Sequence, residues 1–188
     1  MLTCRIAVVA LLAALALPAW AQPTFDGFLC CNLRTDGSWA SDSNYAESGK
    51  RIIPVGTPVR VTGYGRNRVH IEVNGGKQDI GNDYSRELDL GTFAQRWVVK
   101  DDPSAKLASF PAKIRDAIKS ARVTKGMTRE QVAMAVGWPI TSENPNLDAE
   151  IWRMWISSFA EYQIKFDKSG RVVEVVTDPQ TKNLVVLD

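Results

Sequence analysis

The sequence has few side chains that can perform catalysis. Of its 188 residues three are cysteine and one, His70, is histidine. Apolar residues alternate with polar ones around His70, which places it on the polar face of a strand as a solvated side chain. The sequence shows no paired carboxylates, glycine-rich phosphate loop, catalytic triad or metal-ligand cluster at a suitable spacing. We therefore expect a protein that is not an enzyme and has no catalytic residue, cofactor or metal.

An excess of one charge and a second long apolar run are also missing. The chain has 23 Lys and Arg against 21 Asp and Glu, a formal net charge of +2. This balance leaves no basic stripe to neutralise phosphates, so nucleic acid is not an expected partner. Beyond the N-terminus no segment is long and apolar enough to span a bilayer. We expect a protein that does not span the membrane.

Residues 1–21 have the three parts of a cleaved signal peptide. Arg5 supplies the positive charge, residues 6–16 form an apolar run of about eleven residues, and Pro18 ends it. Ala19-Trp20-Ala21 places small residues where a signal peptidase reads them, which predicts cleavage before Gln22. The early cysteine, Cys4, precedes the apolar run rather than following it, so lipidation is not expected. The predicted location is the periplasm, without a lipid anchor.

The predicted mature chain has two cysteines, Cys30 and Cys31, which are adjacent. Three interpretations remain open: two small buried thiols, an intermolecular or vicinal disulfide, or a redox or soft-metal site. An oxidising compartment favours disulfides, and thiolates suit copper(I) and zinc. No second pair of metal ligands lies nearby in the sequence. Cys30 and Cys31 are therefore a candidate thiol site.

Residues 25–100 have the alternation and the turns of a β-rich domain. Residues 69–73 and 77–80 flank Asn74-Gly75-Gly76, which predicts a hairpin. Residues 41–50 are too polar to contribute to a core. Residues 101–109 contain Asp101-Asp102-Pro103-Ser104 and no apolar periodicity, which predicts a linker. The first domain is predicted to be a small barrel or sandwich.

Residues 110–188 are predicted to form an α+β domain. Ile114, Ala117, Ile118 and Ala121 have helical spacing after Pro111. Thr128 and Gln131 fit a capping box, with Met127 and Val132 as a hydrophobic staple, and Gly137 and Pro139 end that helix. Three strands follow, marked by Trp152, Met154 and Ile156, by Tyr162, Ile164 and Phe166, and by Val173 and Val175. Two helices would cover one face of an antiparallel sheet.

The other face of this predicted sheet is a candidate partner-binding surface. Alternation directs Arg153, Trp155, Gln163 and Lys165 away from the helices. Arginine and tryptophan are enriched at interface hot spots. A second interpretation remains open, in which Trp155 packs under the loop of residues 141–148.

The motifs of the second half resemble the SmpA/OmlA, or BamE-like, domain of the bacterial cell envelope. The similar segments are Gly126-Met127-Thr128 with Gln131-Val132, then Gly137-Trp138-Pro139, Trp152, and Phe166-Asp167 with Gly170 and Val172. Residues 54–61 resemble the entry to a bacterial SH3-like strand. The resemblance implies a helix-helix-three-strand fold and a role in outer-membrane assembly or envelope maintenance.

From these features we expect a non-enzymatic periplasmic binding or scaffold protein. Its expected partner is an envelope protein or a cell-wall or lipid component. The alternative is a periplasmic protein of thiol redox or soft-metal handling that uses Cys30 and Cys31. The sequence does not favour a particular oligomeric state.

Overall fold

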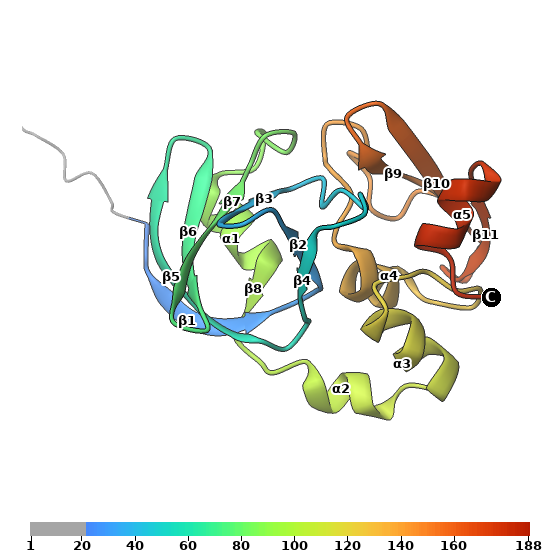
Figure 1. The fold of residues 1–188 in the computed structure, drawn as a ribbon, viewed down its shortest axis with the longest axis horizontal. Helices are drawn as coiled ribbons and strands as arrows, with labels where there is room; N and C mark the ends of the chain where they lie inside the picture. Colours follow the sequence, from blue (N-terminus) through green and yellow to red (C-terminus); the bar gives the residue numbers. More distant parts are fainter. Residues whose placement is uncertain (1–21) are drawn as a thin grey trace, which may run out of the picture.

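The computed structural model describes residues 22–188 as a mixed α+β fold with one curled β-sheet and one three-stranded antiparallel sheet (Figure 1). The predicted signal peptide, residues 1–21, lies outside the described residues. Within residues 22–188, every helix is too short or too polar to cross a bilayer.

The N-terminal half is built from eight strands. They are β1 (Phe25–Leu29), β2 (Leu33–Thr35), β3 (Trp39–Ser41), β4 (Arg51–Ile53), β5 (Pro58–Gly65), β6 (Arg68–Val73), β7 (Gly76–Gly81) and β8 (Val98–Val99). The curled sheet has the order β3-β7-β6-β5-β1-β8, and β2 pairs with β4 separately. The predicted hairpin is confirmed, because β6 and β7 pair antiparallel with Val73 opposite Gly76.

A helix interrupts the strands of the N-terminal half, where the sequence analysis expected strands throughout. Helix α1 spans Leu90–Trp97 and begins at Asp89, whose carboxylate accepts a hydrogen bond from the Thr92 backbone N–H. Phe93, Ala94 and Trp97 are buried in the core of the curled sheet. The apolar residues of this segment are spaced as in a helix, and this period had been missed.

The first two helices predicted for the C-terminal half are confirmed. Helix α3 (Ala112–Lys119) begins after Pro111, and its apolar stripe is buried. Helix α4 (Arg129–Val136) has Thr128 as N-cap, with both hydrogen bonds of the capping box to Gln131. Met127 and Val132 are fully buried, as a hydrophobic staple requires.

The three predicted strands form the sheet β11-β10-β9, made of β9 (Ile151–Ser157), β10 (Ala160–Phe166) and β11 (Val172–Val176). Tyr162, Ile164 and Phe166 are buried against the helices, as predicted. The prediction for Val173 is wrong. A register shift beside Phe166 places Val172 in the core and leaves Val173 44% exposed. A bulge of this kind reverses the faces of the residues beyond it.

Two further helices lie outside the predicted elements. Helix α2 (Ser104–Ser109) occupies much of the predicted linker, and its one half-buried side chain, Leu107, packs against the core of the C-terminal half. Helix α5 (Pro179–Val185) begins at Asp178, whose carboxylate accepts hydrogen bonds from the backbone N–H groups of Gln180 and Thr181. Val185 of α5 is fully buried in the core of the C-terminal half.

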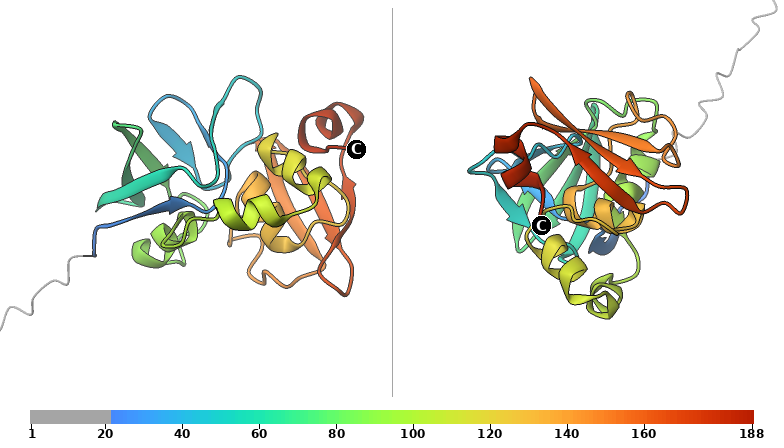
Figure 2. Two further views of the ribbon diagram at one scale, coloured as in Figure 1. Left: turned by 90° about the horizontal axis from the view of Figure 1, so that it is seen from below. Right: turned by 90° about the vertical axis from the view of Figure 1, so that its right-hand side faces the viewer.

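The two halves have separate apolar cores and lie side by side (Figure 2). One core belongs to the curled sheet and α1, and the other to α3, α4, α5 and the three-stranded sheet. Trp138, just after α4, packs against both. The loop that follows β3 also reaches the second core, through Ala46.

Polar side chains of the N-terminal half hold the ends of α3 and α4. The Asn32 amide donates to the carbonyls of Ile118 (2.6 Å) and Ala135 (3.0 Å), and its oxygen accepts from the Val55 N–H. The Asn44 amide donates to the Val136 carbonyl at 2.7 Å. Carbonyls at helix C-termini have no partner inside the helix, so these asparagines act as caps supplied by the other half.

The prediction that residues 41–50 stay outside the core is wrong, because Asp42, Ser43, Asn44 and Ala46 are all buried. Buried polar groups are tolerated when they are hydrogen-bonded. The Asn44 side chain accepts from the Arg34 N–H and donates to the Asn32 carbonyl. A Cβ at Gly137 would lie 2.8 Å from Asn44 Nδ2. Glycine at the end of α4 therefore allows Asn44 to approach.

Candidate binding pocket at the junction

Cys30 and Cys31 form a disulfide between adjacent residues. Of the three interpretations left open by the sequence, the vicinal disulfide is the one present in the structure. Cys31 is fully buried in the core of the N-terminal half, whereas Cys30 is half-buried and lines a pocket at the junction of the halves. Cys30 Sγ lies 3.0 Å from the Arg96 carbonyl oxygen. A disulfide sulfur has no proton, so this contact is a hydrogen bond only in the thiol form.

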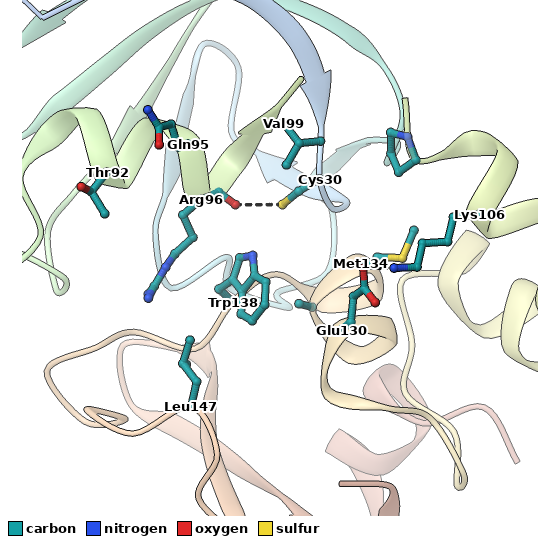
Figure 3. Close-up of a pocket in the computed structure, with 12 residues that line it drawn as sticks. Cys30, Thr92, Gln95, Arg96, Val99, Lys106, Glu130, Met134, Trp138 and Leu147 are labelled. Carbon is teal, nitrogen blue, oxygen red and sulfur yellow. Dashed lines mark hydrogen bonds and ion pairs between the residues drawn. The ribbon is translucent and has the colours of Figure 1, made fainter. Parts of the chain in front are cut away.

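The junction pocket has a volume of about 370 Å³ (Figure 3). One group of lining residues is largely apolar and comes from both halves: Cys30, Val99, Pro103, Ala133, Met134, Trp138 and Leu147. The second group is polar: Thr92, Gln95, Arg96, Lys106 and Glu130. Ligand pockets are typically concave, mostly apolar and supplied with a few polar groups, and the junction pocket has all three properties.

Helix α1 contributes Arg96, the most unusual polar residue of the pocket. Its Nη1 is buried and has no hydrogen-bond partner within residues 22–188. No carboxylate of these residues lies within 4.0 Å of its guanidinium nitrogens. Burial lowers the pKa of Arg96, and the more distant charges of Glu87 and Asp42 oppose this effect. The guanidinium carbon lies 5.9 Å from the centre of the Trp138 ring.

The other cation of the pocket is compensated. The Lys106 ammonium forms an ion pair with the Glu130 carboxylate, which joins α2 to α4 at the rim. Both side chains are about half exposed, at 52% and 53%. The charge of Arg96 is therefore the one in the pocket wall that no ion pair within the described chain neutralises.

The four residues predicted for the open face of the C-terminal sheet do share one face. Arg153 lies opposite Gln163, and Glu161 lies opposite Trp155. Their polar groups are already engaged: Arg153 Nε lies 3.1 Å from Glu161 and Lys165 Nζ lies 2.9 Å from Glu174. Trp155 is half-buried and donates its indole N–H to Glu143 at 3.0 Å, within the loop that the second interpretation named. Contact with this loop thus explains part of the burial of Trp155 and the hydrogen bond of its indole N–H.

His70 lies away from the pocket and next to a carboxylate. Its Nδ1 is 2.7 Å from Asp79 Oδ1 on the neighbouring strand β7, and its side chain is 41% exposed. The described residues contain no group of three or more histidine, cysteine or acidic side chains placed to bind a metal ion. The vicinal cysteines therefore have no further ligands of these types beside them.

Of the residues that line the pocket, Cys30 alone was a predicted site residue. Arg96 was missed because its helix was missed, although Leu90, Phe93, Ala94 and Trp97 have the spacing i, i+3, i+4 and i+7. The motif Gly137-Trp138-Pro139 contains Trp138 but does not predict that its ring lines a pocket. Its position between two cores depends on the packing of two halves, which no local pattern describes.

Comparison with known proteins found no matching family model, no similar curated protein and no similar solved structure.

Proposed function

We propose that this chain is a non-enzymatic binding protein of the bacterial envelope whose binding site is the junction pocket. The observation that carries the proposal is a pocket of about 370 Å³ with apolar walls from both halves. Burial of apolar surface supplies the binding free energy in such a site, and a few polar groups set the orientation of the ligand.

The envelope assignment, including export to the periplasm, rests on the sequence of residues 1–21 and on the BamE-like motifs. The chain order α3, α4, β9, β10, β11 supports the BamE-like part, since the motif requires two helices followed by three strands. The curled sheet of the N-terminal half supports the SH3-like part more weakly. A mass spectrum of the exported protein tests export: a chain that begins at Gln22 supports it, and a retained Met1 contradicts it.

Titration with 1-octanol and with octanoate, followed by NMR, tests the pocket. We expect saturable shifts of the Trp138 indole and of α1 amides with at least one of the two compounds. Gln95 is exposed on α1 and lines the pocket, so Gln95→Trp should block binding with little loss of stability. Gln180→Trp is the matched control, since Gln180 is also an exposed helical glutamine, on α5. Failure of both compounds to bind, or no effect of Gln95→Trp, would contradict the proposal.

The disulfide favours a second function, thiol redox exchange. A thiolate of a dithiol reductant would attack Cys30 Sγ, break the S–S bond and release Cys31 as a thiolate that takes up a proton. The second thiol of the reductant would then displace Cys30, so that two electrons and two protons pass to the cysteines and the reductant becomes a disulfide. Titration of free thiols in folded protein, before and after dithiothreitol, tests this function. Two new thiols per chain are expected, and resistance of the disulfide to reduction would argue against it.

A further inference from the structure

The pocket wall has one charged group without a counter-ion. Among residues 22–188, Arg96 Nη1 is buried without a partner, and Lys106, the other cation, is bound to Glu130. A charge removed from water is costly unless it is paired or hydrogen-bonded. A ligand that supplied an anion at Arg96 would recover that cost through both charge and hydrogen bonds, whereas a neutral ligand would supply a hydrogen bond alone.

The surroundings of Arg96 also restrict the remainder of the ligand. In Figure 3 Trp138 lies beside the Arg96 side chain, and Met134 and Leu147 extend the pocket wall. These three side chains offer apolar surface but no charge. The volume of about 370 Å³ is at the lower end of what small-molecule sites enclose. The ligand would therefore combine a compact apolar body with one anionic group.

We propose that the junction pocket binds a small amphiphilic monoanion whose carboxylate pairs with Arg96 while its apolar body lies against Trp138, Met134 and Leu147. This inference rests on the proposed function and adds the chemical class of the ligand. Arginine pairs with carboxylates in a planar two-bond geometry that a hydroxyl group cannot reproduce. The pocket accordingly discriminates by charge between molecules of the same length.

Three eight-carbon compounds test the charge preference in the unmodified protein: octanoate, 1-octanol and octylammonium. Isothermal titration at pH 8 should give an affinity for octanoate at least tenfold above that for octanol, and the lowest affinity for octylammonium. Equal affinities for octanoate and octanol would overturn the inference and leave the proposed function standing. Absence of binding by all three would overturn both.

Variants of arginine test whether Arg96 is the group responsible. Arg96→Gln should lower the octanoate affinity about tenfold and leave octanol within twofold. Arg86→Gln is the matched control, because Arg86 is exposed, lies outside the pocket and changes the net charge equally. Octanoate binding that is unchanged in Arg96→Gln, or equally weakened in Arg86→Gln, would overturn the inference.

A final arm distinguishes a free amphiphile from an anionic membrane surface, which offers similar chemistry. Sedimentation with phosphatidylglycerol vesicles should leave the protein in the supernatant, since a pocket of this size does not admit a bilayer surface. Binding to vesicles without binding of octanoate would overturn the inference.

Discussion

The arginine–tryptophan pair of the sheet face, Arg153 and Trp155, and that of the junction pocket, Arg96 and Trp138, differ in how their polar groups are satisfied. On the open face of the C-terminal sheet, Arg153 lies 3.1 Å from Glu161, and the Trp155 indole donates to Glu143. In the junction pocket, Arg96 has no carboxylate within 4.0 Å among the described residues, and its charge lies near the Trp138 ring.

This difference shows why residue type alone is a poor guide to a binding site. Both pairs have the composition of an interface hot spot. A partner at the sheet face would exchange ion pairs that the chain already makes for new ones, and such an exchange gains little free energy because exposed ion pairs contribute little. A ligand in the pocket would meet an apolar wall and an unpaired charge. Partner binding by Arg153, Trp155, Gln163 and Lys165 stays a prediction, and the pocket is the stronger candidate.

The largest expected effect comes from breaking the junction on which the pocket depends. Asn32→Ala would leave the Ala135 carbonyl and the Val55 N–H without their partner, and would leave the Ile118 carbonyl with the Ala121 N–H alone. An orphaned buried polar group costs about 1–3 kcal/mol, so we expect a loss of about 4 kcal/mol in the free energy of unfolding. Chemical denaturation measures this loss, and the pocket should lose octanoate with it.

Asn183→Ala is the control for this variant, because Asn183 is exposed on α5. Alanine favours helix more than asparagine does, so stability should stay within about 0.5 kcal/mol of the parent. A loss below about 1 kcal/mol in Asn32→Ala would show that water replaces the caps and that the halves are held by apolar packing alone.

The two tryptophans allow the two surfaces to be compared directly. Trp138 packs against both cores, so Trp138→Ala should cost about 3 kcal/mol and abolish binding of octanol as well as octanoate. Trp155 is half-buried with one hydrogen bond, so Trp155→Ala should cost about 1 kcal/mol and leave pocket binding unchanged. Denaturation and isothermal titration on both variants provide the measurements. Loss of octanoate binding in Trp155→Ala would contradict the distinction between the surfaces.

The features of the fold that were predicted correctly have local signals. Thr128 and Gln131 are three residues apart, and their capping box forms as expected. Tyr162, Ile164 and Phe166 alternate strictly and are all buried. In each case, residues close in sequence determine the structure, so the pattern and the fold agree.

The junction could not be predicted in this way because its contacts join distant segments. Asn44 looked like a solvated loop residue, yet its amide bonds to Val136, 92 residues away. Polarity predicts exposure only where no partner exists inside the protein. The pocket was unpredictable for the same reason, because Cys30, Arg96 and Trp138 belong to three separate segments. Only the helical period of α1 was a usable signal that had been overlooked.

Asp42 should make the stability of the junction depend on pH. Asp42 is 2% exposed, and burial raises its pKa from 3.8 to about 6, although the Tyr84 backbone N–H donates to it. A carboxyl with a raised pKa destabilises the folded state when it is ionised. The contribution of Asp42 to stability should therefore be most favourable below about pH 4 and should fall by about 2–3 kcal/mol as pH rises from 4 through 6.

Asp42→Asn isolates this contribution, because an amide remains neutral and can still accept the Tyr84 hydrogen bond. At pH 8 the variant should be more stable than the parent by about 2 kcal/mol, and the two should converge near pH 4. The charge of Asp42 also acts on Arg96 through space, so octanoate should bind about threefold more tightly to the variant. Parallel pH–stability curves for the two proteins would show that Asp42 is solvated.

The smallest effect is expected at the start of α4, the helix that carries Glu130, Ala133 and Met134 to the pocket. Thr128→Ala removes the hydroxyl that accepts from the Gln131 N–H and should cost about 1 kcal/mol. Glu130 lies in the first turn, so fraying of this turn should weaken its ion pair with Lys106. Met134 lies in the last turn and should stay in place. Octanoate affinity should thus change less than twofold.

Thr128→Ser retains the hydroxyl and is the control. Unchanged denaturation in Thr128→Ala would show that the cap contributes nothing, and a large loss of binding would show that the polar rim, not Arg96 and Trp138, holds the ligand.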